Sequence, residues 1–359
     1  MKVLYLINYA GSGGSERYVE LLVKYFHKNK CDCGLCYNVD GALVEKMAAL
    51  GVPTHRLGMK SILDLAAAKK LAQLVKTQGY DVIHAQYPRE NYIAILAKAF
   101  GCRAKIVFTS HLIMEQPPVW KLLNRFFTPK NHAVLTVCTY GREVLERNGV
   151  AKDKIRIVFN GVDAKAAPAA DRSVLAEFGV KDNERILSIL TRFSEEKGVP
   201  FLLRATAKLK EKTDVPFRLL VVGTGPDFDR DRELVPRLGL QDTVILTGFR
   251  TDTAKLLAAS DIYLNSSSSE AMSFAILEAL GAGLPLVVTD VGGNPELVNT
   301  GEVCGLLAPY GDEDAYASAM QRLLEDDALR ARYAAAARAK AEGEFDLYNL
   351  LDKLFEIYQ

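Results

Sequence analysis

The stretch Asn265–Gly293, NSSSSEAMSFAILEALGAGLPLVVTDVGG, decides the predicted fold and site. It begins as the polar end of a strand and passes through four serines and Glu270. A short helix is expected from about Ser273 to Leu280, and glycines end it. A second apolar strand, Leu286–Thr289, then leads to a pair of glycines. This order places a helix N-terminus directly after the end of a strand.

The start of this helix is predicted to bind an anion. The first N–H groups of a helix, here those of Phe274, Ala275 and Ile276, have no partner within the helix, and the helix dipole favours a phosphate beside them. Ser273 is the predicted N-cap. The Gly292-Gly293 pair can form a second backbone nest for the same anion.

Two carboxylates accompany this anion site. Glu270 lies in the loop before the helix, and Glu278 lies about five residues inside it. A diphosphate that joins two sugars would fit, with one sugar at each glutamate. The alternative is an ordinary strand–helix–strand unit with solvated glutamates.

Composition indicates a soluble protein of two domains with ample core. The chain has 359 residues, of which 49% are hydrophobic and 25% charged. No apolar run approaches the length of a membrane span, and no signal peptide is expected. The six cysteines are predicted to be free thiols in a reducing cytosol, because Cys31-x-Cys33-x-x-Cys36 lacks the second ligand pair that a zinc site needs.

Strand and helix patterns alternate along both halves, which predicts doubly wound parallel sheets. The expected domains are 1–163 and 164–344, with a final amphipathic helix at 345–359. Residues 1–163 hold 23 Lys+Arg against 13 Asp+Glu, so their net charge is +10, whereas the remainder is at −9. The basic half either meets something anionic, such as a membrane surface, or attracts the acidic half.

Other candidate residues lie where strands end. Arg192 and Lys197 flank a turn after the first strand of the second half, where two cations can neutralise a diphosphate. His111 ends a strand of the first half, although a lone histidine is more often structural. The glycine turn Gly11–Gly14 does not have the spacing of a nicotinamide-binding motif.

The segment Val119–Phe127 mixes basic and aromatic residues at helical spacing. It is predicted to be a core face with solvated charges, and contact with a membrane interface is the alternative. No Asp-x-Asp pair stands where it could form a metal site, since Asp227-Phe228-Asp229 lies in a charged run. The sequence therefore predicts no metal and no cofactor, with basic groups and helix dipoles in place of a cation.

The chain resembles the retaining glycosyltransferases of family 4, which have the GT-B fold. The resemblance rests on Glu270 and Glu278 at E-x7-E spacing, on Gly283-Leu284-Pro285, and on Gly292-Gly293-Asn294-Pro295-Glu296. This chain departs from the family where many members have Gly-Phe-Gly after the first glutamate and it has Ala271-Met272-Ser273-Phe274. The resemblance implies two Rossmann-like domains facing across a cleft, with the C-terminal helix crossing back to the first.

The resemblance also implies roles for residues that match the family. Arg192 and Lys197 would stabilise the departing diphosphate, Glu278 would bind the ribose, and Glu270 would hold sugar hydroxyls and the positive charge near the anomeric carbon. His111 would contact the donor sugar. Gly13 and Gly14 would face the donor phosphate or the acceptor. Gly223 would border the nucleobase, and Phe249 and Arg250 would line it.

The resulting prediction is a cytoplasmic, bacterial, retaining enzyme that moves a sugar from a UDP- or GDP-sugar to an acceptor hydroxyl of a glycan, glycolipid or cell-surface polysaccharide. The second domain would take the donor, and the first the acceptor, through loops such as Gln86–Asn91 and Leu112–Pro118. Peripheral contact with an anionic membrane is a candidate, and nucleic acid is not an expected partner. The alternatives are a UDP-sugar 2-epimerase of GT-B fold and a non-catalytic sugar-nucleotide-binding subunit.

Overall fold

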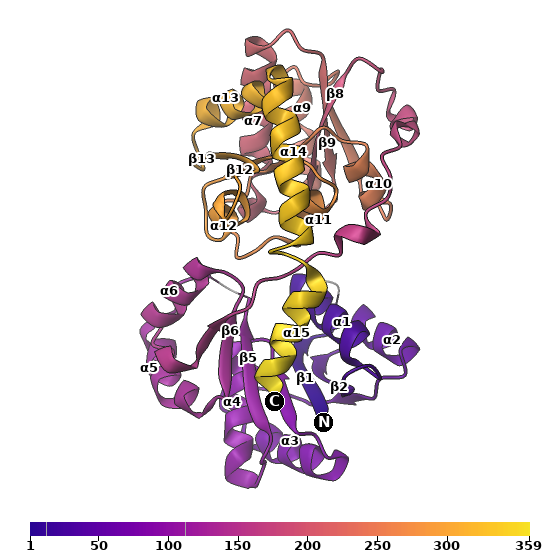
Figure 1. Cartoon of the computed structure of the whole chain (residues 1–359). Helices are drawn as coiled ribbons and strands as arrows, with labels where there is room; N and C mark the ends of the chain where they lie inside the picture. The colour runs from indigo at the N-terminus through magenta and orange to yellow at the C-terminus, as the bar shows by residue number, and fades with distance from the viewer. Residues whose placement is uncertain (12, 112) are drawn as a thin grey trace. The chain divides into compact units, whose positions relative to one another are not determined.

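The computed structural model describes residues 1–11, 13–111 and 113–359, and it divides the chain into two compact units (Figure 1). The N-terminal unit comprises Met1–Phe159 and Leu351–Gln359, and the C-terminal unit comprises Asn160–Leu350. The boundary falls a few residues before the predicted one at Asp163. Ser12 of the glycine turn and Leu112 of a predicted acceptor loop lie outside the described residues.

The N-terminal unit is built on a sheet of seven parallel strands in the order β3-β2-β1-β4-β5-β6-β7. The strands are β1 (Lys2–Tyr9), β2 (Asp32–Val39), β3 (Thr54–Arg56), β4 (Val82–Ala85), β5 (Lys105–Ser110), β6 (Ala133–Thr136) and β7 (Ile155–Ile157). The helices between them are α1 (Gly14–Phe26), α2 (Ala42–Ala49), α3 (Leu65–Gln78), α4 (Pro88–Ala97), α5 (Pro118–Phe127) and α6 (Thr139–Arg147).

Alternation along β1 explains why helices cover both faces of this sheet. Successive side chains of a strand point to opposite faces. Leu4 and Leu6 join a core cluster with Leu71 of α3 and Tyr92 of α4. The intervening Tyr5 is equally buried but packs toward His84 on the other face.

The last helix, α15 (Leu347–Tyr358), completes that other face (Figure 1). Its Tyr358 hydroxyl lies 2.6 Å from His84 Nδ1, and His84 Nε2 lies 2.7 Å from Thr109 Oγ1. Phe355 packs on Phe26 of α1. The predicted return of the C-terminal helix to the first unit is therefore confirmed. Burial lowers the pKa of His84 to about 3, so this histidine is a neutral core residue.

The C-terminal unit has six parallel strands in the order β10-β9-β8-β11-β12-β13. They are β8 (Arg185–Leu190), β9 (Phe217–Val222), β10 (Val244–Gly248), β11 (Ile262–Asn265), β12 (Leu286–Thr289) and β13 (Gly305–Ala308). The helices are α7 (Val199–Lys212), α8 (Phe228–Arg232), α9 (Leu234–Arg237), α10 (Thr253–Ala258), α11 (Phe274–Gly281), α12 (Asn294–Asn299), α13 (Glu313–Glu325) and α14 (Asp327–Glu342). Leu187 of β8 packs with Leu202 of α7, whereas the adjacent Ile186 packs with Leu256 of α10. This sheet too is covered on both faces.

Helix α4 begins at Pro88, because proline at the first helical position needs no N–H partner. Helix α5 differs from the sequence-based expectation, because it is only partly a core face. It buries Phe127 and Asn124, while Val119, Leu122 and Phe126 on its other side are 59%, 66% and 64% exposed.

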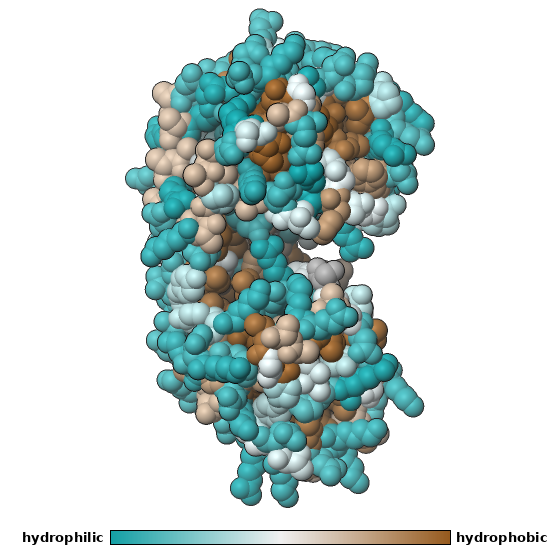
Figure 2. Space-filling model, turned by 90° about the vertical axis from the view of Figure 1, so that its right-hand side faces the viewer, coloured by the Kyte–Doolittle hydropathy of each residue, from teal (hydrophilic) through white to brown (hydrophobic). Residues whose placement is uncertain are grey.

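Polar side chains dominate the face of the molecule shown in Figure 2, and apolar ones gather there in small patches. Within 1–11, 13–111 and 113–359, no helix has the length and hydropathy needed to cross a bilayer.

Candidate active site

The turn that carries Lys197 is fixed against the end of β11. Gly198 has φ +64°, and a Cβ there would lie 2.2 Å from the carbonyl oxygen of Ser266. The Ser266 hydroxyl in turn donates to the carbonyl oxygen of Lys197 at 2.9 Å. Only glycine permits this close approach, which brings the turn Glu195–Lys197 beside the loop that follows β11.

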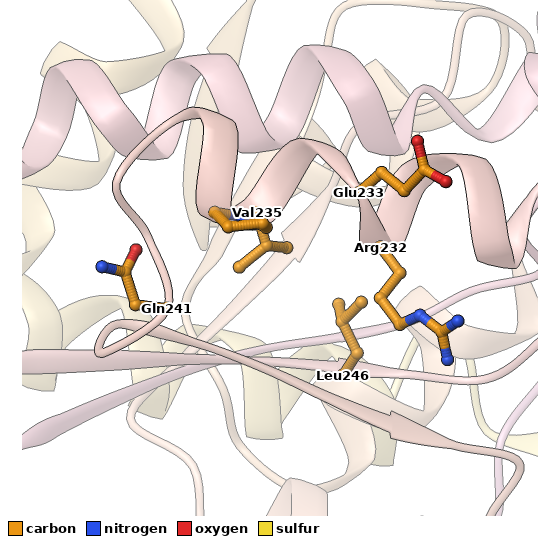
Figure 3. A pocket seen from close by; sticks show the side chains of 6 residues that line it. Arg232, Glu233, Val235, Gln241 and Leu246 are labelled. Atoms are coloured by element: carbon orange, nitrogen blue, oxygen red, sulfur yellow. The ribbon is translucent and has the colours of Figure 1, made fainter.

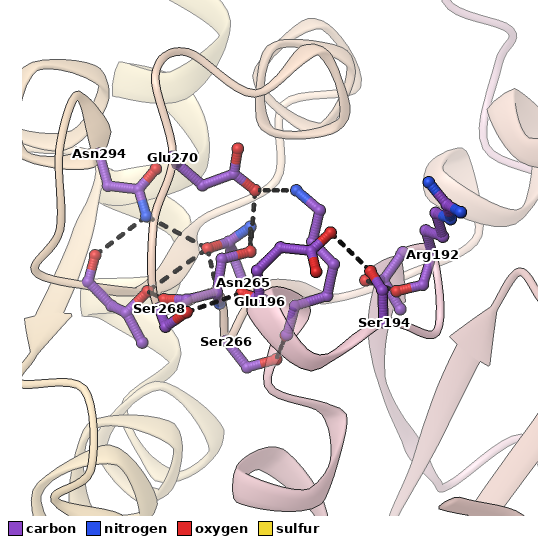
Figure 4. Close-up of polar contacts among 12 residues, drawn as sticks. Arg192, Ser194, Glu196, Asn265, Ser266, Ser268, Glu270 and Asn294 are labelled. Carbon is purple, nitrogen blue, oxygen red and sulfur yellow. Dashed lines mark hydrogen bonds and ion pairs between the residues drawn. The ribbon is translucent and has the colours of Figure 1, made fainter. Parts of the chain in front are cut away.

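This packing joins Lys197 to Glu270, although 73 residues separate them in the chain (Figure 4). Lys197 Nζ lies 2.6 Å from Glu270 Oε1, and the Ser267 hydroxyl donates to the same oxygen at 2.8 Å. The Glu270 side chain is only 10% exposed and that of Lys197 26%. A carboxylate and an ammonium are thus held together in a partly buried position, where charges act more strongly than in water.

A buried polar network holds the loop that carries Glu270 (Figure 4). Asn294 Nδ2 donates to Asn265 Oδ1 at 3.1 Å and to the carbonyl oxygen of Thr289 at 3.0 Å. The Thr289 hydroxyl donates to the carbonyl oxygen of Ser267 at 2.6 Å. Sequence reasoning did not assign Asn265, Thr289 or Asn294 to the site. Asn265 and Thr289 each stand as a polar residue at the end of an apolar strand, whereas Asn294 begins α12 and was noted only as part of the Gly-Gly-Asn-Pro-Glu motif.

The Gly292-Gly293 turn does not form the predicted anion nest with both of its N–H groups. The N–H of Gly293 donates to the carbonyl oxygen of Glu270 at 3.1 Å. Gly292 takes the left-handed φ of +53° that this approach requires. The turn therefore anchors the loop of Glu270 through the Gly293 N–H, which is not available to an anion.

Helix α11 follows this loop. Ser273 occupies the N-cap position, as predicted, but its hydroxyl makes no capping hydrogen bond. Phe274, Ala275 and Ile276 form the first turn, and Glu278 lies half-buried one turn later. The helix start, the Lys197–Glu270 pair and Glu278 all belong to the C-terminal unit.

The other donor-site candidates of this unit differ in how they are held. Gly223 follows β9 with φ +137°, and its N–H donates to the carbonyl oxygen of Gly248 at 2.9 Å. Phe249 is 75% exposed. Arg250 donates to both oxygens of Glu177 and both oxygens of Asp252, so most of its donor groups are already used. Arg192 is exposed, and its guanidinium points away from Glu270 (Figure 4).

His111, in the N-terminal unit, follows the end of β5. Its Nε2 donates to Gln86 Oε1 at 2.9 Å, because the amide nitrogen of Gln86 itself donates to the carbonyl oxygen of His84. Burial lowers the pKa of His111 to about 4, so the ring is neutral at pH 7 and its Nδ1 is the acceptor nitrogen. Tyr18 packs edge-on against the ring at 5.1 Å.

Gly13 is the N-cap of α1 and Gly14 its first residue. A Cβ on Gly14 would meet no atom of the residues that the structure describes within 4 Å, and the φ of Gly14 is not positive. The fold alone therefore gives no reason for glycine at this position, whereas a ligand that approaches the backbone would.

A separate pocket of the C-terminal unit contains none of the predicted residues (Figure 3). It has a volume of about 450 Å³ between α8, α9 and β10, and its wall is mainly apolar, with Val235 and Leu246 flanked by Arg232, Glu233 and Gln241. Among the residues that the structure describes, no cluster of three or more His, Cys, Asp or Glu side chains could hold a metal ion.

Comparisons with known proteins follow the division into two units. The family model "Glycosyltransferase Family 4" matches residues 12–166, and "Glycosyl transferases group 1" matches residues 172–340. The N-acetyl-alpha-D-glucosaminyl L-malate synthase of Bacillus anthracis is 32% identical over 303 residues, which cover 82% of this chain and 78% of the relative.

Two further proteins are similar over most of their length. The UDP-Gal:alpha-D-GlcNAc-diphosphoundecaprenol alpha-1,3-galactosyltransferase of Escherichia coli is 27% identical over 88% of this chain and 84% of its own. The crystal structure of Anabaena HepE in complex with UDP superposes with a TM-score of 0.86 at 23% identity, over 99% of each chain. That likeness bears on the fold, which is GT-B. Because the family models and the Bacillus relative agree, the chain belongs to glycosyltransferase family 4, in group 1 of the glycosyltransferases.

Proposed function

We propose that this glycosyltransferase transfers a sugar from a UDP- or GDP-sugar to an acceptor hydroxyl in glycan, glycolipid or surface-polysaccharide synthesis, and that it retains the configuration of the donor. The observation that carries the proposal is the Lys197–Glu270 pair immediately before the N-terminus of α11. A cation, a carboxylate and the positive end of a helix dipole lie together there. This set suits a sugar joined to a diphosphate.

In the proposed reaction the C-terminal unit binds the donor. The N–H groups at the start of α11, with Lys197 and Arg192, stabilise the diphosphate as its bond to the anomeric carbon breaks. Glu270 stabilises the positive charge that develops on the sugar ring, and Glu278 accepts from the ribose. These groups would take the place of a metal ion.

The acceptor oxygen bonds to the same face of the anomeric carbon, and its proton passes to the departing phosphate oxygen. His111 and Gly14 of the N-terminal unit are assigned to the donor sugar, and Phe249 to the nucleobase. Because Arg250 is held by two carboxylates, its proposed part at the base is to position Phe249.

The proposal is tested with a panel of nucleotide sugars, with Mg²⁺ or with EDTA. One donor should raise the melting temperature and support transfer in EDTA, and proton NMR of the product should show the anomeric configuration of the donor. Inversion of configuration, activity only with Mg²⁺, or conversion of a UDP-sugar to its 2-epimer without any acceptor would each contradict the proposal.

We further propose that α5 rests on an anionic membrane surface. Val119, Leu122 and Phe126 form one exposed stripe on this helix, and Lys130 Nζ lies 4.2 Å from the ring of Phe126. The excess of basic residues in 1–163 complements anionic lipid. The E. coli relative is named for a lipid-linked acceptor, which supports a site close to lipid.

Vesicle flotation checks this contact. The wild-type protein should float with phosphatidylglycerol vesicles, less so at high salt, and the Leu122→Glu/Phe126→Glu variant should not, because each added carboxylate opposes both burial and attraction. Val303→Glu, at an exposed apolar position of the acidic C-terminal unit, is the matched control. Equal flotation with phosphatidylcholine vesicles, or no difference between the variants, would refute the membrane contact.

A further inference from the structure

The N-terminal unit contains a pocket at the carboxyl ends of β1 and β4, where an open α/β sheet binds ligands. Its volume is about 430 Å³, which lies in the usual range for small-molecule sites. The wall includes six aromatic or charged residues that could contact a ligand: Tyr9, Glu16, Tyr87, Arg89, Glu90 and Trp120. They all belong to one unit, so the pocket does not depend on the C-terminal unit.

Glu90 is the residue of this pocket whose hydrogen bonding is incomplete. Its side chain is fully buried, and Arg89 donates through Nε and Nη2 to one oxygen, Oε1, at 3.1 and 2.9 Å. The other oxygen, Oε2, is buried with no hydrogen-bond partner among the described residues. Burial raises the pKa of Glu90 even though Arg89 lowers it. A buried carboxylate oxygen without a donor is costly, and a ligand hydroxyl in the pocket would remove that cost.

A second carboxylate makes the pocket unsuited to anions. Glu16, in the first turn of α1, is 7% exposed and accepts from the Ser15 hydroxyl at 2.8 Å. Ser15 Oγ also lies 2.7 Å from the Tyr87 hydroxyl, which forms part of the wall. Arg89 is already engaged by Glu90. An anionic ligand would therefore meet two carboxylates and one guanidinium whose charge is largely compensated.

The apolar part of the wall is aromatic. The Tyr9 ring is 51% exposed, and Trp120 is half-buried against Tyr92, with ring centroids 5.8 Å apart. Aromatic faces present broad apolar surfaces, and phenol and indole groups add donors at the edges. The combination of such rings with carboxylate acceptors matches a sugar ring, which has C–H groups on its faces and hydroxyl donors around its rim.

We propose that this pocket holds a glycosyl residue of the acceptor, a neutral or amino sugar whose ring hydroxyl donates to Glu90. The assignment rests on the proposed function and adds the chemical class of the acceptor. Tyr87 links the pocket to His111 of the same unit, the residue assigned to the donor sugar, because the two ring centroids lie 6.2 Å apart. A sugar seated here differs in class from the L-malate for which the Bacillus relative is named.

Saturation-transfer NMR tests the class of ligand directly. The probes are the methyl glycosides of glucose, N-acetylglucosamine and glucosamine, with methyl glucuronide and L-malate as anions. The wild-type protein should bind at least one neutral or amino glycoside in preference to both anions. Glu90→Gln should weaken that binding about tenfold or more, because an amide replaces the charged acceptor. Glu115→Gln, at an exposed ion-paired carboxylate of the same unit, should bind like wild type.

A second variant protects the test against misfolding. Tyr9→Ala changes an exposed ring and should also weaken glycoside binding while the melting temperature is kept. Preference for malate or glucuronide, no glycoside binding by wild type, or unchanged binding in both Glu90→Gln and Tyr9→Ala would overturn the assignment. Nucleotide-sugar binding is measured on the same samples. If the wild-type protein binds no nucleotide sugar, that result counts against the proposed function and not against this pocket.

Discussion

Glu270→Gln is expected to lower the turnover number at least about 100-fold, which is the usual cost of removing one group that stabilises transition-state charge. The neutral amide can still accept a hydrogen bond from Lys197 or Ser267, so the loop should keep its conformation. It cannot, however, stabilise a positive charge on the donor sugar. Initial rates at saturating donor, with the melting temperature measured alongside, report the two effects separately.

Because Glu270 and Lys197 form an ion pair, single and double variants can separate their roles. If Glu270 acts only by holding Lys197, then Glu270→Gln, Lys197→Met and the double variant should all lose the same amount of activity. If each group acts on its own part of the donor, Lys197→Met should weaken nucleotide diphosphate binding about tenfold, and the losses should be closer to additive. We expect the second pattern.

Glu195→Gln provides the matched control, because Glu195 lies exposed on the same turn as Lys197. It should change the rate by less than about twofold, as surface charges far from developing charge usually do. Glu270→Gln activity within threefold of wild type would remove Glu270 from the chemistry and leave it a structural partner of Lys197.

The central strands and most helices could be predicted because their signals are local. Phe217–Val222 is apolar except for Arg218 and coincides with β9. The apolar stripe of the last helix only permitted its packing on the first unit, which the family resemblance implied and which the structure confirms. Strands β3 and β13 were not predicted. Both strands lie at sheet edges, have only three or four residues, and are partly exposed. Such short segments show too few apolar residues for a strand to be recognised from hydrophobic periodicity.

In the candidate site, too, some features could be predicted from the sequence and others could not. The glutamates, Arg192 and Lys197 were found from spacing and resemblance, whereas the contact between Lys197 and Glu270 needed the tertiary packing of Gly198 on Ser266. The pairing of Arg89 with Glu90 carries no sequence signal, because adjacent residues of opposite charge are common on helix surfaces. Only the burial of Glu90 separates it from a solvated glutamate.

Gly223→Ala is expected to destabilise the C-terminal unit by about 2–5 kcal/mol, through the strained φ and through overpacking. A Cβ at this position would lie 1.9 Å from the carbonyl oxygen of Thr191, and a φ of +137° is strained for any side chain. The loop after β9 would have to move, which would break the hydrogen bond from Gly223 to Gly248. Donor binding should fall together with stability, because this loop and the one that bears Phe249 are joined by that bond.

Gly239→Ala separates the two causes. Gly239 has a left-handed φ of +66°, lies in the same unit, and has open space where a Cβ would stand, so its substitution should cost only about 1–2 kcal/mol. Urea unfolding followed by circular dichroism reports both units, whereas the fluorescence of Trp120, the only tryptophan, reports the N-terminal unit. Gly223→Ala should lower the dichroism midpoint well beyond the Gly239→Ala value. Equal midpoints for the two variants would mean that the loop accommodates the new methyl group, and the close approach to Thr191 would then not explain the glycine.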